Sequence, residues 1–160
     1  MFKRTCFGFA LALVASALVV IGCAGGGSSV SAGDANHDAK LMATWLMATL
    51  QTTNPATGPS ACPKSVTLAN TDTASCAASE NVVFNADGTY SHSVAGVVDD
   101  TGTWTSAGNA LTITSTTPGG GGGVVNLEWM VDAAGTTLTV MWVDANAGGS
   151  SDITMTATKV

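Results

Sequence analysis

Alternation of apolar and polar residues between short turns is the feature that most constrains the fold of this chain. From residue 80 onward, segments in which every second residue is apolar are separated by turns rich in Asp, Asn and Gly. The turn at residues 85–88, Asn-Ala-Asp-Gly, is the sharpest, because Asp-Gly between alternating segments is a strong hairpin signal. A period of two places successive side chains on opposite faces of a strand. The pattern therefore predicts consecutive antiparallel strands with one apolar face.

The number of these strands indicates whether the sheet can close into a barrel. Residues 41–52 fit either a helical face or a strand buried on both sides, and we assign a strand because the rest of the chain is so plainly β. No helical pattern separates the later strands, which disfavours a parallel α/β sheet. With residues 41–52 the chain has about eight antiparallel strands, enough for a sheet to close on itself. We expect an all-β, up-and-down barrel, with an open β-sandwich or meander as the alternative.

The N-terminus has the pattern of a secretory signal. Lys3 and Arg4 precede an uncharged apolar stretch over residues 6–21, and Gly22 and Cys23 follow it. The sequence Val-Ile-Gly-Cys at residues 20–23 resembles the lipobox of bacterial lipoproteins. The resemblance implies that the chain is cleaved before Cys23, that its thiol carries a diacylglycerol, and that its amino group receives an acyl chain such as palmitate. The alternative is an uncleaved transmembrane helix, since the apolar stretch approaches spanning length.

This interpretation divides the chain into a signal peptide (1–22), a lipidated flexible linker (23–40) and a barrel domain (41–160). The mature chain carries three lysines and eleven acidic residues, a net charge of −8 with His neutral. Such a surface repels nucleic acid and does not attract anionic lipid. The lipid on Cys23 is therefore the expected membrane anchor. Ala24, rather than Asp, after the cysteine resembles the outer-membrane address of Gram-negative lipoproteins, so we expect a location in the cell envelope.

Cysteine usage agrees with export. Cys6 belongs to the signal peptide and Cys23 to the lipid anchor, which leaves Cys62 and Cys76 as an even pair in an oxidising compartment. We therefore expect a disulfide between them. It would explain how residues 53–79, a longer connection than a compact domain normally contains, stay ordered. Only two histidines occur and there is no Cys-x-x-Cys, so no metal site and no cofactor are expected.

Three segments of the predicted sheet resemble bacterial lipocalin-like domains. Residues 84–90 read Phe-Asn-Ala-Asp-Gly-Thr-Tyr, residues 102–104 read Gly-Thr-Trp, and residues 109–113 read Asn-Ala-Leu-Thr-Ile. In the first strand, Ala43-Thr44-Trp45 stands where the family commonly has Gly-x-Trp. The resemblance covers residues 41–160 and implies a lipocalin-like barrel. It assigns no ligand.

The sequence contains no set of residues for acid–base or nucleophilic catalysis, so we expect no enzyme. Our first functional hypothesis is a barrel that binds a small apolar or amphipathic ligand. Its expected lining consists of the four tryptophans and the tyrosine on the strands and the histidine in phase with that tyrosine: Trp45, Tyr90, His92, Trp104, Trp129 and Trp142. Met155 is expected to lie beside them. The alternative is a structural or interaction lipoprotein with a filled core, whose 53–79 segment contacts an envelope protein.

Two narrower expectations concern neighbouring side chains. Trp129 and Trp142 flank one turn and are expected to pair across strands. Asp99 and Asp100 are consecutive in a strand, so they should face opposite ways and lie on the solvated surface. The glycine run at residues 119–123 lacks the Lys and Ser/Thr of a phosphate loop and predicts only a flexible loop.

Overall fold

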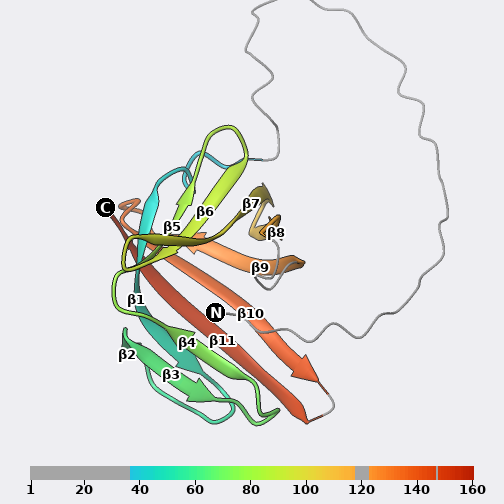
Figure 1. Ribbon diagram of the computed structural model, residues 1–160. Helices are drawn as coiled ribbons and strands as arrows, with labels where there is room; N and C mark the ends of the chain where they lie inside the picture. Colours follow the sequence, from blue (N-terminus) through green and yellow to red (C-terminus); the bar gives the residue numbers. More distant parts are fainter. Residues whose placement is uncertain (1–36, 118–122, 147) are drawn as a thin grey trace, which may run out of the picture.

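A computed structural model describes residues 37–117, 123–146 and 148–160 (Figure 1). The predicted signal peptide, Cys23, residues 23–36 of the linker and most of the glycine run lie outside the described residues. The strands are β1 (Thr44–Thr52), β2 (Ser60–Ala61), β3 (Lys64–Thr67), β4 (Thr73–Cys76), β5 (Glu80–Phe84), β6 (Thr89–Val94), β7 (Val97–Ala107), β8 (Ala110–Ser115), β9 (Val124–Val131), β10 (Thr137–Asn146) and β11 (Gly149–Lys159).

A closed antiparallel barrel is formed by β1 and the seven strands from β5 to β11. Each of these strands pairs with the next one, and β11 returns to pair with β1. The up-and-down, lipocalin-like barrel predicted from the alternation is therefore confirmed, and the open sandwich is not what forms. The strand expected over residues 41–52 is also present, although it begins at Thr44.

The segment between β1 and β5 is more structured than the sequence indicates. It contains β2, which pairs with the second half of β1, and the separate hairpin β3–β4. The expected disulfide is confirmed: Cys62 and Cys76 are bonded, with their Cα atoms 5.5 Å apart. The sequence predicts residues 53–79 only as a long connection, and the structure adds three short strands to it. Strands of two and four residues are too short to display the alternation by which the longer strands are recognised.

One end of the barrel is closed by residues 37–43, and we call it the closed end. Leu41 is completely buried, and its carbonyl accepts a 2.8 Å hydrogen bond from Trp45 Nε1. The His37 Nε2 atom lies 2.6 Å from the carbonyl oxygen of Trp104, and the two rings are 4.6 Å apart. The Phe84 ring also packs against Trp104, with the ring centroids 5.2 Å apart. Aromatic side chains from β1, β5 and β7 therefore fill this end.

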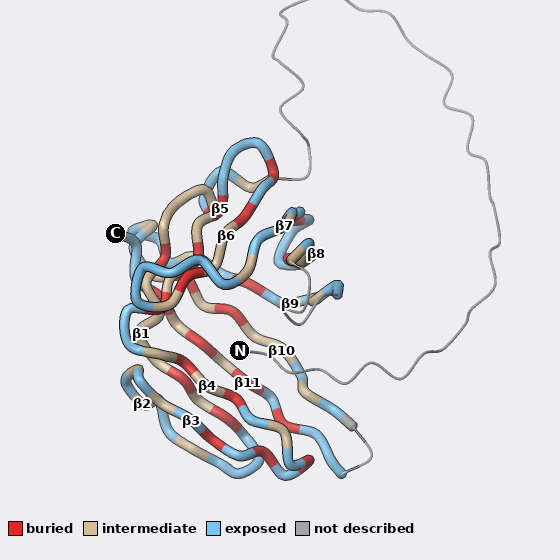
Figure 2. The backbone as a smooth tube through the Cα atoms, in the orientation of Figure 1, coloured by how far each residue is buried: buried red, intermediate tan, exposed pale blue. Residues whose placement is uncertain are grey.

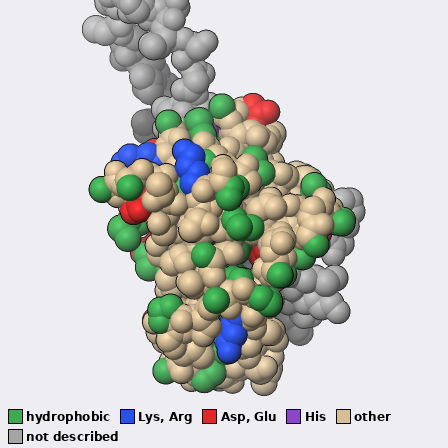
Figure 3. All heavy atoms as spheres, turned by 90° about the vertical axis from the view of Figure 1, so that its left-hand side faces the viewer, with side chains coloured by type: hydrophobic (Ala, Val, Ile, Leu, Met, Phe, Trp, Pro, Cys, Tyr) green, Lys and Arg blue, Asp and Glu red, His purple; other side chains and the backbone are tan. Residues whose placement is uncertain are grey.

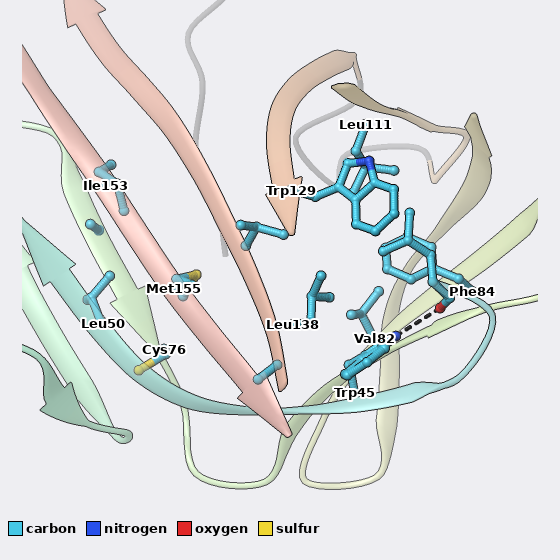
Figure 4. Packing of buried hydrophobic residues seen from close by; sticks show 14 of the residues in the cluster. Trp45, Leu50, Cys76, Val82, Phe84, Leu111, Trp129, Leu138, Ile153 and Met155 are labelled. Carbon is cyan, nitrogen blue, oxygen red and sulfur yellow. Dashed lines mark hydrogen bonds between the residues drawn. The ribbon is translucent and has the colours of Figure 1, made fainter. Parts of the chain in front are cut away.

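The hairpin β3–β4 covers the opposite half of the long strands β1 and β11. Val66, Leu68 and Ala74 of this segment are buried in the same cluster as Leu50 and Ile153. Figure 2 shows buried residues along β1 and β11 and on the facing hairpin, and Figure 4 places Cys76 beside Leu50. The outer surface seen in Figure 3 carries scattered hydrophobic side chains rather than one apolar patch. The core therefore continues from the barrel into the space under the hairpin.

Candidate ligand-binding site

The barrel wall is interrupted between β9 and β10, because their pairing covers only part of each strand. The two strands pair only from Leu138–Val131 to Met141–Glu128, whereas β10 continues with β11 as far as Asn146. Residues 124–127 of β9 and 142–146 of β10 therefore diverge, as Figure 1 shows. We call this divergence the seam. It leaves an interruption in the wall near the end of the barrel opposite the closed end.

The inward-facing apolar side chains beside the seam are only half-buried. Ile113, Leu127 and Trp142 pack against the core cluster but keep part of their surface accessible. The inward residues of the same sheet nearer the closed end, such as Leu111 and Leu138, are almost completely buried. The inner wall thus passes from a packed region to one that solvent reaches.

Trp129 lies on the inner wall between these two regions. It is 6% exposed and its register partner on β10 is Val140, a residue of the core. Its Nε1 atom is buried and has no hydrogen-bond partner among the residues that the structure describes. The indoles of Trp45 and Trp104 differ, since they donate to the carbonyl oxygens of Leu41 and Asn85. In Figure 4 the Trp129 nitrogen lies near Leu111.

A hydroxyl–carboxylate network lies on the inner wall of β6, β7 and β8. Asp100 accepts hydrogen bonds from Tyr90 Oη at 2.7 Å and from Ser115 Oγ at 2.6 Å. Burial raises the pKa of Tyr90, and the bond to Asp100 raises it further. Burial by itself would raise the pKa of Asp100, but the hydroxyl donors, Ser115 first, lower it below its usual range. Asp100 is therefore an ionised carboxylate facing inward.

A second charged cluster joins β5, β6 and β7 at the same end of the barrel. His92 Nε2 is 2.9 Å from Glu80 Oε1, and His92 Nδ1 is 2.5 Å from Asp99 Oδ1. Glu80 also accepts the backbone N–H of Ala77, where the chain leaves β4. Burial opposes both charges, but the contacts outweigh it: the pKa of His92 is raised and that of Glu80 is lowered. We call these three side chains the His92 cluster.

A shallow groove of about 370 Å³ borders this cluster. One wall is the hairpin, with Pro63, Lys64 and Ser65, and the other is the barrel, with Glu80 and Val94. Glu80 is 6% exposed, so a largely buried acidic residue lines the groove. Among the described residues, no group of three or more His, Cys, Asp or Glu side chains is arranged to hold a metal ion.

The residues predicted to line a ligand site fall into separate places. Trp45 and Trp104 belong to the packed closed end, while Met155 is buried on β11. Tyr90 and His92 contribute to the two polar clusters, and Trp129 and Trp142 lie beside the seam. The expected pairing of Trp129 with Trp142 is wrong: Trp129 lies opposite Val140 and Trp142 opposite Ile153, because the β9–β10 ladder stops before residue 142.

The surface assignment of Asp100 is also wrong, because its carboxylate is partly buried and hydrogen-bonded inside the wall. Asp99, by contrast, is exposed as expected. The sequence reading missed Glu80 and Ser115 as polar groups of the barrel. Both are in phase with apolar residues of their own strands, Glu80 with Val82 and Ser115 with Ile113. A polar residue in phase with an inward apolar series is the signal that could have found them.

The fold and these clusters define a closed eight-stranded antiparallel barrel with one packed end, a lipocalin-like architecture. Comparisons with models of protein families, with curated proteins and with solved structures found no match to this chain. Within the described residues, no helix is long and apolar enough to cross a membrane.

Proposed function

We propose that this protein is a non-enzymatic lipoprotein of the cell envelope whose barrel binds a small apolar or amphipathic ligand. The observation that carries the proposal is the half-buried inner wall at Ile113, Leu127 and Trp142. Apolar side chains that face the inside of a barrel yet remain accessible are typical of a ligand surface. The polar groups of Tyr90, Asp100 and His92 at the same end give that surface an amphipathic rim.

Attachment to the membrane is the second part of the proposal. Cys23 would carry the lipid, and two or three acyl chains would hold the mature domain stably, whereas one chain binds only reversibly. The outer membrane of a Gram-negative bacterium is the proposed location, because Ala24 follows the cysteine. Cys23→Ser should abolish cleavage and labelling by radioactive palmitate. Normal processing and membrane fractionation of this variant would refute the anchor.

Ligand binding is tested with the mature domain and the neutral fluorescent dye Nile red. We expect the dye to brighten on binding, and Trp142→Ala to weaken binding because it removes accessible apolar area from the inner wall. Thr105→Ala, on an exposed position of β7, serves as the matched control and should bind as the wild type does. Equal dye binding by all three proteins would count against a site at the seam.

A second candidate function is a structural or interaction lipoprotein. The observation in its favour is the dense closed end, where Trp45 and Trp104 are buried and their indole N–H groups are bonded. The hairpin would then supply the contact surface for an envelope protein. A photoreactive amino acid at Ser65, on an exposed position of β3, should capture that partner in intact cells. Recovery of only free monomer would argue against it.

A further inference from the structure

The indole of Trp129 is the most unusual polar group of the inner wall. A buried hydrogen-bond donor without a partner is costly, and native proteins rarely retain one without a reason. Within the described part of the chain Trp129 Nε1 has no partner, although the residue is only 6% exposed. The residue faces inward from β9, at the boundary between the packed wall and the seam. A molecule inside the barrel could therefore supply the missing acceptor.

The charges at the seam end of the barrel indicate which acceptor suits the site. Glu80, Asp100 and Asp144 lie on the inward register of β5, β7 and β10. Lower pKa values keep the first two ionised, whereas the positive groups described there are His92 and, on the hairpin, Lys64. A ligand carboxylate entering between these groups would meet net negative charge, which is unfavourable. An uncharged oxygen avoids this repulsion.

We propose that Trp129 Nε1 donates a hydrogen bond to an uncharged oxygen of the ligand, an ester, ketone or alcohol attached to an apolar chain. This inference rests on the proposed function and names the ligand class of the same inner wall. The ligand enters at the seam, its apolar part lies against Leu127 and Trp142, and its oxygen reaches the indole. Free fatty acids are disfavoured because of the carboxylates at that end.

The test compares ligands that differ only in the polar group. Dodecyl acetate, dodecanol and dodecanoate, with tetradecane as the hydrocarbon, are used to displace Nile red from the wild type and from two variants. Trp129→Phe removes the N–H but keeps an aromatic ring. We expect this variant to bind dodecyl acetate and dodecanol about fivefold more weakly, because roughly one net hydrogen bond is lost. Its affinity for tetradecane should not change. Trp142→Phe is the matched control and should weaken every ligand in the same proportion.

A second measurement does not depend on the variants. In a ¹H–¹⁵N spectrum of the wild type, the indole N–H of Trp129 should shift downfield with dodecyl acetate and stay in place with tetradecane. Assignment follows from the signal lost in Trp129→Phe.

The outcomes separate the inference from the function on which it rests. Equal weakening of dodecyl acetate and tetradecane by Trp129→Phe, or an unmoved indole signal, would overturn the inference while ligand binding stands. Tighter binding of dodecanoate than of dodecyl acetate would overturn the uncharged ligand class. If none of the probes displaces the dye, or the dye itself does not bind, the proposed function fails and the inference fails with it.

Discussion

The His92 cluster predicts how the stability of the domain depends on pH. A neutral imidazole has one N–H and can donate to one carboxylate, whereas protonated His92 donates to both Glu80 and Asp99. The pKa of His92 is raised in the folded protein, so its contribution is fully present below the unfolded value of 6.5. It is lost as the pH rises through the higher folded pKa. The free energy of unfolding should therefore fall on the alkaline side.

At acidic pH the same cluster makes the free energy of unfolding change in the opposite direction, so that it falls as the pH is lowered. The pKa of Glu80 is lowered from 4.5, so its contribution is present above that value and is lost as the pH falls through the lower folded pKa. Both charges are in place between about pH 5 and pH 6. The cluster should stabilise the domain most within this window.

The size of the effect follows from burial. The Glu80 and His92 side chains are 8% and 17% exposed, so their charge-assisted bond should contribute about 2 kcal/mol. The Asp99 side chain is 40% exposed, and its contact should add less than about 1 kcal/mol. Neutral His92 keeps one of the two bonds. The wild type should therefore lose about 1–2 kcal/mol as His92 deprotonates.

The assay is urea unfolding followed by tryptophan fluorescence, with the disulfide intact, at intervals between about pH 5.5 and pH 8.5. His92→Gln should be about 2 kcal/mol less stable than the wild type at the acidic end, and it should lack the alkaline fall. His37→Gln removes the other histidine and should keep that fall. A wild-type stability that is constant or rises over this range, or an equal fall in His92→Gln, would refute the reasoning.

Three further substitutions test other contacts by the same unfolding measurement. Gly102→Ala should cost more than about 3 kcal/mol or prevent folding, because a Cβ there would lie 2.0 Å from a backbone carbonyl oxygen of β8; wild-type stability would contradict this packing. Tyr90→Phe should lower the stability by about 1 kcal/mol, since Asp100 loses the Tyr90 hydroxyl as a donor, and no change would mean that water replaces the bond. Replacing Cys62 and Cys76 together by Ala should cost about 3 kcal/mol, as expected for a short closed loop, and a cost near zero would show that the hairpin is held without the bond.

The barrel was predictable because its strands are long enough to display alternation. The residues of β5 and β11 alternate between buried and less buried positions over five or more residues. The disulfide was predictable by counting cysteines. These inferences depend on local sequence patterns, which do not depend on how distant parts of the chain pair.

The His92 cluster and the seam depend on register, which local patterns do not fix. A β-bulge between β6 and β7 pairs His92 with Asp100 and Ser93 with Val98, so Asp99 is the extra residue. Strict alternation predicts that Asp99 and His92 point apart, and the bulge brings them together. Similarly, nothing in the sequence of β10 indicates that β9 leaves it before Trp142. Irregularities of this kind arise from closure of the whole barrel.

The way β2 completes the wall has a consequence for solubility. β5 pairs with β1 only at residues 44–46, and β2 takes over beside Thr49 and Leu50. Without residues 53–79, half of a nine-residue central strand would present unsatisfied backbone groups next to apolar side chains. Exposed edges of this kind recruit strands from other molecules. The inserted segment thus protects the protein from self-association, and chains that lose it should aggregate even where the remaining strands can still pair.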